Sequence, residues 1–236
     1  MKEEGLVIVT GASRGVGRAT AMALLRDHGR HVLALARDAD ALGSLQLEAQ
    51  QAGGRLQTLV LDLASEEAAQ QVSDAIGPRR VSALVNNAGL LLKRDLGTWS
   101  SEDMLRLYRV NVVAPLLLVQ LLADRLAGTP AGHVVNIGSM GGVQGSAKFP
   151  GLLGYSASKG ALVTVTECLA EELKDRGVSA NCLCLGAVDT EMLREAFPGF
   201  RAPVAAEEVG AFIARFTLEG AKLFNGKTLQ VAVGTP

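Results

Sequence analysis

Short apolar runs alternate along this chain with stretches that have the spacing of amphipathic helices. Seven such runs occur, at residues 6–10, 31–36, 56–61, 81–86, 133–139, 178–185 and 228–233. Most are nearly continuous in Val, Leu, Ile and Ala, which is typical of strands buried on both faces of a parallel sheet. The sequence therefore predicts an α/β fold: a doubly wound, Rossmann-type, seven-stranded parallel sheet with helices on both faces.

The composition points away from several classes of protein. With 48% hydrophobic and 20% charged residues the chain is globular, and a formal net charge of -1 gives no reason to expect nucleic acid or an anionic membrane as partner. The apolar stretch at 115–123 is interrupted by Gln120 and is too short to span a bilayer. The N-terminus does not resemble a signal peptide. We expect a soluble, cytoplasmic protein.

The residues that most often bind metals are scattered. They are Cys168, Cys182, Cys184, His28, His31 and His133. None of the cysteines has the spacing of metal ligands or of a redox pair, so we expect buried thiols. The histidines are not spaced with cysteines or carboxylates either, and no metal is expected.

A glycine-rich turn follows the first apolar run directly. Residues 10–17 read TGASRGVG, so Gly11, Gly15 and Gly17 lie where the first strand passes into a helix. Glycines at this point let the backbone approach a pyrophosphate closely, and the helix N-terminus offers N–H groups to the anion. The spacing is not that of the commonest dinucleotide fingerprint. Its place between strand and helix nevertheless favours phosphate binding over a turn kept only for packing.

Four further motifs follow in order: NNAG at 86–89, Asn111, Ser139 and YSASK at 155–159. Together with the glycine-rich turn they resemble the short-chain dehydrogenase/reductase family, from Leu6 to about Val233. The resemblance implies one dinucleotide-binding and catalytic domain over residues 1–236. It also implies hydride transfer between a nicotinamide and a small-molecule carbonyl or alcohol, in a homodimer or homotetramer. Residues 115–126 and 161–173 are the candidate helices for the assembly.

The end of the second apolar run bears on the choice of coenzyme. Enzymes that prefer NAD usually carry an acid there for the ribose hydroxyls, whereas this chain has Ala36 and then Arg37. Arg14 would lie on the same side of the ribose, and two guanidinium groups suit a 2′-phosphate. We therefore predict NADP(H). NAD(H) remains the alternative because Asp38 follows, and Arg37 could instead be a solvated loop residue.

The resemblance extends to a set of cofactor-binding residues. Asp62 resembles the family residue at the adenine edge, with a helix N-cap as an alternative or additional role. After the sixth run the chain keeps Gly186 and Thr190 but has Leu185 where the family commonly has proline. The whole expected set is Gly11, Ser13, Arg14, Gly15, Val16, Gly17, Arg37, Asp62, Leu63, Asn87, Ala88, Gly89, Tyr155, Lys159, Gly186, Val188 and Thr190.

Tyr155 and Lys159 are spaced i and i+4, so on a helix both project from one face. A free phenol has a pKa of about 10. A nearby ammonium and the charge of an oxidised nicotinamide would lower it. The resemblance makes Tyr155 the general acid for reduction and the general base for oxidation, and it makes Lys159 a ligand of the nicotinamide ribose. The alternative is a half-exposed structural pair.

Ser139 and Asn111 complete the catalytic set that the resemblance implies. Ser139 would hold the substrate oxygen, with Ser146 as a weaker rival. Asn111 would hold a water that passes protons from Lys159 to solvent, and its alternative roles are a local bend or an interhelix hydrogen bond. Fifteen residues separate Ser139 from Tyr155. We interpret part of residues 141–154 as an insertion that shapes substrate choice.

The substrate itself is less constrained. Residues 191–203 match the family's cover over the substrate, and their apolar side chains suit a hydrophobic carbonyl compound or, equally, core packing. A narrower alternative is a 3-oxoacyl-carrier-protein reductase, which would want a basic patch. The candidates for that patch are Arg79, Arg80, Lys93, Arg94, Arg106, Arg109 and Arg125. A non-enzymatic NADP(H) sensor or scaffold is the alternative from another class, but it has no need of the full catalytic set.

Overall fold

Seven parallel strands form a single sheet in the computed structural model, which describes residues 5–128 and 132–233. Their order across the sheet is β3-β2-β1-β4-β5-β6-β9. The strands are β1 (Leu6–Thr10), β2 (His31–Ala36), β3 (Arg55–Val60), β4 (Val81–Asn86), β5 (Gly132–Ser139), β6 (Val178–Leu185) and β9 (Thr228–Val231). The predicted doubly wound parallel sheet is confirmed, and only β9 is clearly shorter than its apolar run.

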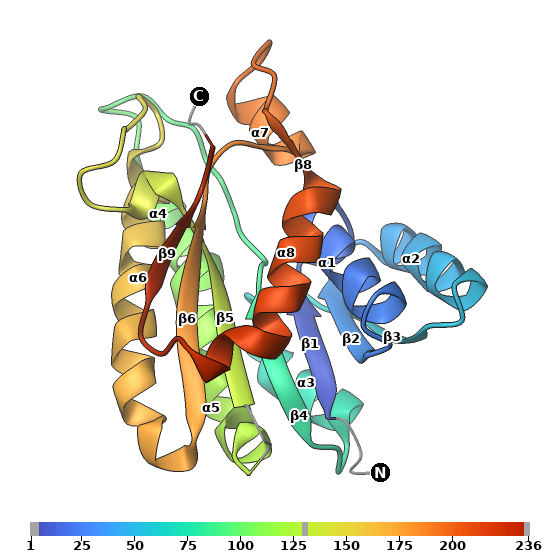
Figure 1. The fold of residues 1–236 in the computed structure, drawn as a ribbon. Helices are drawn as coiled ribbons and strands as arrows, with labels where there is room; N and C mark the ends of the chain where they lie inside the picture. The colour runs from blue at the N-terminus through green and yellow to red at the C-terminus, as the bar shows by residue number, and fades with distance from the viewer. Residues whose placement is uncertain (1–4, 129–131, 234–236) are drawn as a thin grey trace.

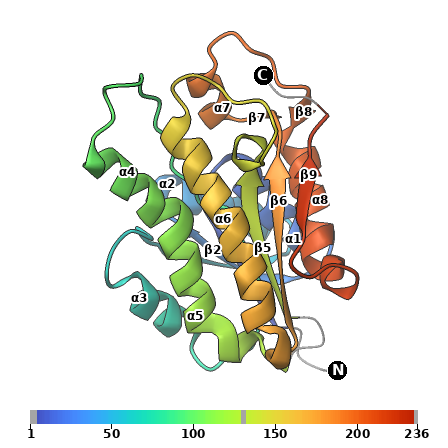
Figure 2. The same cartoon turned by 90° about the vertical axis from the view of Figure 1, so that its left-hand side faces the viewer.

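Helices cover both faces of the sheet (Figures 1 and 2). One face carries α1 (Gly15–Arg26), α2 (Ala39–Gln51) and α8 (Ala206–Glu219), and the other carries α3 (Ala68–Ile76), α5 (Ala114–Leu126) and α6 (Leu153–Glu172). Successive residues of a strand point to opposite faces. In β1, Val7 and Val9 join the first core while Leu6 and Ile8 join the second. Two buried faces explain why the apolar runs are continuous.

One long helix on the second face is made of three consecutive segments, and the sequence did not predict its length. α4 (Ser101–Tyr108), a π-helical segment (Arg109–Val113) and α5 continue into one another over 26 residues. By length and composition alone this helix could cross a membrane, but the core helix of a globular protein passes the same test. Here Leu118 and Leu122 pack into the second core. We interpret it as a core helix.

A small unit stands at the carboxyl edge of the sheet, above the strand ends (Figure 1). β7 (Val188–Asp189) and β8 (Val204–Ala205) pair in parallel, and α7 (Glu191–Ala196) lies between them in the chain. This is the segment that the sequence predicted as the cover of a substrate site.

The cysteines differ in part from expectation. Cys182 and Cys184 are buried, with their Sγ atoms 3.8 Å apart, but Cys168 is exposed on α6. The prediction of three buried thiols was wrong at Cys168, because its position in the helix faces away from the core. Within the described ranges no cluster of three or more His, Cys, Asp or Glu side chains is placed to hold a metal ion.

His133 is buried in β5, and both of its ring nitrogens have partners. Nδ1 lies 3.0 Å from the carbonyl oxygen of Thr217, and Nε2 lies 2.9 Å from the side-chain amide nitrogen of Asn181. A carbonyl can only accept and an amide nitrogen can only donate, so this pairing fits the neutral ring with its proton on Nδ1. Burial lowers the pKa of His133 to about 4.

We expect the free energy of unfolding to fall as the pH drops from 6.5 to about 4. In that window the unfolded chain binds a proton at His133 that the native state does not, so stability rises with pH. Protonation of His133 in the unfolded chain lowers the free energy of unfolding by about 3 kcal/mol over this window, at about 1.4 kcal/mol per unit of pKa difference. Urea unfolding of wild type and His133→Gln across this range would measure it, with His28→Gln as control. If His133→Gln kept the wild-type pH dependence, the assignment to His133 would be wrong.

Candidate active site

One elongated cavity of about 610 Å³ opens at the carboxyl ends of the central strands. All but two of the predicted site residues line it. Those that do are Gly11, Ser13, Arg14, Gly15, Val16, Arg37, Asp62, Leu63, Asn87, Ala88, Gly89, Ser139, Tyr155, Lys159, Gly186, Val188 and Thr190. The two that do not are Gly17 and Asn111. Motifs far apart in the sequence thus meet at one site.

The glycine-rich turn is fastened to the NNAG turn. Thr10 Oγ1 accepts hydrogen bonds from the backbone N–H groups of Asn87 (3.0 Å) and Ala88 (2.9 Å). The Asn87 side-chain amide donates in return to the carbonyl oxygens of Thr10 and Gly11. A Cβ at Gly17 would come within 2.3 Å of both that amide and the Gly11 carbonyl oxygen. Gly17 therefore serves the packing of the turn, and lies beneath the cavity instead of on its wall.

The upper side of the same turn suits an anion. Gly11 and Gly15 both have positive φ, which only glycine adopts readily, and both line the cavity with bare backbone. The N-terminus of α1 follows at once, with no side-chain cap and no acidic residue in its first turn. Its first N–H groups are therefore available to a phosphate. The turn fits the pyrophosphate of a dinucleotide.

Two charged residues, Arg37 and Asp38, follow β2, and only one of their side chains has a hydrogen-bond partner in the described chain. Arg37 is exposed on the cavity wall, and its side chain makes no hydrogen bond or ion pair to the rest of the described chain. The carboxylate of Asp38 accepts a hydrogen bond from the backbone N–H of Ala41 (2.9 Å), so it caps α2. Arg14, the other predicted phosphate ligand, forms an ion pair with Glu191 of α7. The sequence did not predict that pair.

Asp62 lies further along this end of the cavity. Its Oδ1 accepts a hydrogen bond from the backbone N–H of Ala64 (2.9 Å), which holds the turn that it begins. The predicted helix N-cap was wrong, because α3 begins only at Ala68 and Glu67 occupies the cap position. The carboxylate remains exposed on the cavity wall.

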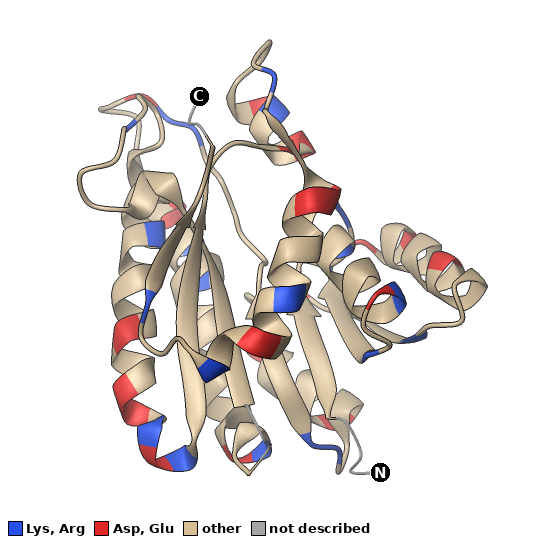
Figure 3. Cartoon of the chain, in the orientation of Figure 1, with Lys and Arg blue, Asp and Glu red and all other residues tan. Residues whose placement is uncertain are grey.

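The candidate basic residues do not form one patch, and Lys and Arg are spread over the molecule (Figure 3). Arg106 and Arg109 line the cavity. Arg79, Arg80 and Arg125 instead donate to backbone carbonyls near the start of β4, at the opposite edge of the sheet. A carrier-protein surface made of all seven residues is therefore excluded.

Ser139, Tyr155 and Lys159 converge at the centre of the cavity. Lys159 Nζ donates to the carbonyl oxygen of Ile137 (2.7 Å) and lies 6.0 Å from the centre of the Tyr155 ring. Ser139 ends β5, where its Oγ accepts from the backbone N–H of Gly141 (3.2 Å), and its hydroxyl lies beside the Tyr155 side chain. A hydroxyl, a phenol and an ammonium thus face one space.

Burial shifts both titratable groups. It raises the pKa of Tyr155, and the Ser139 hydroxyl beside the phenol acts in the opposite direction. It lowers the pKa of Lys159 to about 8. Lys159 alone therefore does not produce the low phenol pKa that the sequence led us to expect. A lowered value requires more positive charge beside the ring, and an oxidised nicotinamide carries such a charge.

Asn111 is fully buried within the π-helical segment. Its amide donates to the carbonyl oxygen of Leu90 and to Ser158 Oγ, both at 2.9 Å, and its Oδ1 accepts from the backbone N–H of Leu90 (2.7 Å). The helix is widened at this point and is joined to α6 through Ser158, so the interhelix hydrogen bond considered as an alternative role for Asn111 is present. A Cβ on Gly89 would lie 3.6 Å from Asn111 Oδ1 and 3.5 Å from Lys159 Nζ. The water relay stays a prediction.

Ser146 and Ser139 are in different surroundings. Ser146 Oγ donates to the carbonyl oxygens of Met140 and Val143 and accepts from Lys148 Nζ (2.7 Å). These bonds all lie within the 140–152 loop, and Ser146 does not line the cavity. Its hydroxyl serves the loop.

The cover is docked over the far end of the cavity. Phe149 of the loop and Phe197 after α7 meet edge to face, with ring centres 5.2 Å apart. Lys93 Nζ donates to the carbonyl oxygen of Ala196 (3.0 Å) and lies 5.7 Å from the Phe197 ring centre. These contacts between distant loops were not predicted from the sequence.

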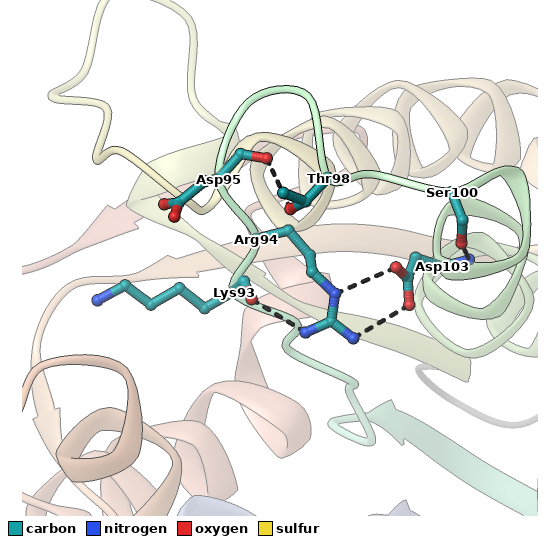
Figure 4. A network of polar contacts seen from close by, with 6 residues as sticks. All are labelled: Lys93, Arg94, Asp95, Thr98, Ser100 and Asp103. Atoms are coloured by element: carbon teal, nitrogen blue, oxygen red, sulfur yellow. Dashed lines mark hydrogen bonds and ion pairs between the residues drawn. The ribbon is translucent and has the colours of Figure 1, made fainter.

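The segment that carries Lys93 is itself held in place (Figure 4). Arg94 pairs with Asp103 through two contacts of 3.1 and 3.4 Å, and Ser100 Oγ accepts from the Asp103 N–H to cap α4. The Arg94 backbone N–H donates to the carbonyl oxygen of Gly151 (3.0 Å). The substrate end of the cavity is thus built from three linked segments.

Comparisons with known proteins agree with this geometry. The family model for short chain dehydrogenases matches residues 5–199. The 3-oxoacyl-[acyl-carrier-protein] reductase of Synechocystis is 30% identical over 189 residues, 79% of this chain and 75% of its own length. L-sorbose reductase from Gluconobacter frateurii, solved with NADPH and L-sorbose, superposes with a TM-score of 0.87 at 22% identity, covering 98% of this chain and 96% of its own. A proposed NAD(P)-dependent gluconate 5-dehydrogenase from Beutenbergia cavernae, solved with NADP, gives a TM-score of 0.84 at 30% identity, with 97% and 95% covered.

Proposed function

Because the chain belongs to the short-chain dehydrogenase family of oxidoreductases, we propose that it is an NADP(H)-dependent carbonyl reductase or alcohol dehydrogenase. The observation that carries the proposal is the meeting of Ser139, Tyr155 and Lys159 in the cavity that also contains the glycine-rich turn. The bound coenzyme would supply or accept a hydride at the carbonyl carbon. The protein's own side chains would transfer the proton and hold the substrate oxygen.

The protein's part is to move one proton and to hold one oxygen. In reduction, Tyr155 gives its phenol proton to the carbonyl oxygen, and in oxidation it takes the hydroxyl proton. Ser139 Oγ hydrogen bonds to the same oxygen. Lys159, with a pKa of about 8, exchanges a proton at Nζ near neutral pH and replenishes Tyr155. Asn111 completes the path to solvent through a water.

The coenzyme would lie along the carboxyl edge of the sheet. The backbone of the glycine-rich turn and the N-terminus of α1 would hold the pyrophosphate. Arg37 and Arg14 would hold the ribose 2′-phosphate, in line with the NADP bound to the Beutenbergia protein. Val188 and Thr190 would lie at the nicotinamide end, and Asp62 at the adenine end.

The substrate end supports a hydrophobic carbonyl compound. Its wall is formed by apolar side chains from the loop and the cover: Phe149, Leu152, Met192, Leu193 and Phe197. Of the narrower candidates, a 3-oxoacyl-carrier-protein reductase is supported by the Synechocystis relative. The dispersed arginines give it no single docking patch.

Replacing Phe149 with Ala should lower kcat/KM for a hydrophobic substrate by about 10- to 200-fold, since a lost apolar contact is worth about 1–3 kcal/mol. The Kd of NADPH should stay unchanged, because Phe149 lies at the far end of the cavity. Leu153→Ala, at the exposed start of α6, is the control. Equal losses in both variants would argue against a substrate-binding role for the loop.

A screen of carbonyl and hydroxyl compounds would test the proposed function. NADPH and NADH absorbance would be followed in parallel, and a 3-oxoacyl-carrier-protein would be compared with small carbonyl compounds. We expect faster oxidation of NADPH. A clear preference for NADH would overturn the coenzyme assignment.

We also propose a cytoplasmic homodimer or homotetramer with no membrane or nucleic-acid partner. Val113, Leu116 and Leu117 are 42%, 38% and 49% exposed and share one face of the long helix, at i, i+3 and i+4. An exposed apolar stripe of this kind supports self-association. Light scattering of the purified protein would give the state directly, and a monomer would refute the proposal.

A further inference from the structure

The ion pair between Arg14 and Glu191 joins two walls of the cavity at its coenzyme end. Arg14 belongs to the glycine-rich turn, and Glu191 is the first residue of α7, directly after the N-cap Thr190. Both side chains line the cavity and are more than half exposed, at 61% and 56%. A pair so exposed adds little to the stability of the fold. Its effect is to occupy Arg14.

Glu191 also differs from the other acids of the cavity. Three acidic residues line it: Asp38, Asp62 and Glu191. Asp38 caps α2 and Asp62 holds its own turn, each through a backbone N–H. Within the described parts of the chain, the carboxylate of Glu191 has Arg14 as its partner. Arg37, by contrast, is unpaired there.

We propose that Glu191 is a determinant of coenzyme choice, because its carboxylate competes with the ribose 2′-phosphate of NADP(H) for Arg14. The inference rests on the proposed NADP(H) function. Arg37 meets the phosphate directly, whereas Arg14 must first leave Glu191. NADH has no such phosphate and is indifferent to the exchange. Glu191 therefore lowers the preference for NADP(H) over NAD(H) below what the two arginines alone would produce.

Isothermal titration of the full chain with NADPH and with NADH tests this, in wild type and in Glu191→Gln. We expect the variant to bind NADPH up to about fivefold more tightly, the scale of an exposed ion pair, and NADH with an unchanged Kd. Asp189→Asn is the matched control. Asp189 lies two residues away, pairs with Arg194, has a similar exposure of 54% and does not line the cavity. It should change neither Kd.

A second background shows whether the effect passes through Arg14. In the Arg14→Gln background, the additional change Glu191→Gln should leave the affinity for NADPH unaltered. The guanidinium for which the Glu191 carboxylate and the 2′-phosphate compete is then absent. An equal gain in that background, an equal gain in Asp189→Asn, or an unchanged ratio of NADPH to NADH affinity in Glu191→Gln would overturn the inference. A wild type that prefers NADH would instead refute the proposed coenzyme, and the ratio would still decide the role of Glu191.

Discussion

Replacing Tyr155 with Phe should reduce kcat/KM for carbonyl reduction by about 10²- to 10⁴-fold, the usual contribution of a positioned proton donor. The change removes one hydroxyl from a side chain that lines the cavity between Ser139 and Lys159. The Kd of NADPH should stay close to the wild-type value, because the ring remains and the phosphate-binding turn is untouched. Steady-state kinetics and titration of the same preparation measure both quantities.

Two serine variants sharpen that experiment. Ser139→Ala removes a hydroxyl that lines the cavity beside Tyr155, and Ser146→Ala removes one that serves only the loop. We expect a large loss of kcat in the first and little change in the second. Full activity in Tyr155→Phe would refute the mechanism. A wild type that binds NADPH but reduces nothing in the screen would favour the sensor or scaffold.

Replacing both Arg14 and Arg37 with Gln should raise the Kd of NADPH by about 100-fold or more. Each hydrogen bond to a charged group contributes about 1.5–3 kcal/mol to the free energy of binding. The net contribution of Arg14 is smaller, because its ion pair with Glu191 must break first. The Kd of NADH should change little, since both arginines serve the phosphate that NADH lacks. Titrations at one fixed ionic strength measure this, because salt screens exposed charges.

Arg18→Gln is the control for that pair. Arg18 lies near the start of α1, just after the glycine-rich turn. Its guanidinium donates hydrogen bonds to Ala41, Ser44 and Glu48, and the residue does not line the cavity. It should leave the ratio of the two affinities unchanged. If the double variant weakened NADH as much as NADPH, the arginines would serve the pyrophosphate or the fold, and the coenzyme assignment would be wrong.

Local regularities explain why the fold was predictable. The central strands of a sheet buried on both faces are apolar at most positions, as in Val7 and Ile8, so their limits show in the sequence. The glycine-rich turn could be recognised because backbone contacts such as that of Gly17 tolerate no side chain. The i, i+4 spacing of Tyr155 and Lys159 likewise follows from helix geometry alone.

Contacts between loops had no such signal. Glu191 and Arg14 are 177 residues apart, and the meeting of Phe149 with Phe197 depends on how two irregular segments turn. The sequence suggested an interhelix hydrogen bond as one role for Asn111 but gave no sign of the π-helical segment. The bonds of Asn111 to Leu90 and Ser158 join residues 21 and 47 positions away, which no periodicity reveals.

The order of the strands separates two tasks along the chain. The two arginines proposed to choose between NADP(H) and NAD(H), Arg14 and Arg37, follow β1 and β2, whereas the proposed reacting groups lie on β5 and α6. Under that proposal the coenzyme preference could be re-engineered without rebuilding the reacting groups. Glu191 is the exception, because it belongs to the substrate cover yet reaches back to Arg14. If Glu191 has the proposed role, a designer who exchanged the cover for new substrates would also alter the coenzyme preference. The separation of coenzyme choice from substrate binding therefore ends at the Glu191 carboxylate.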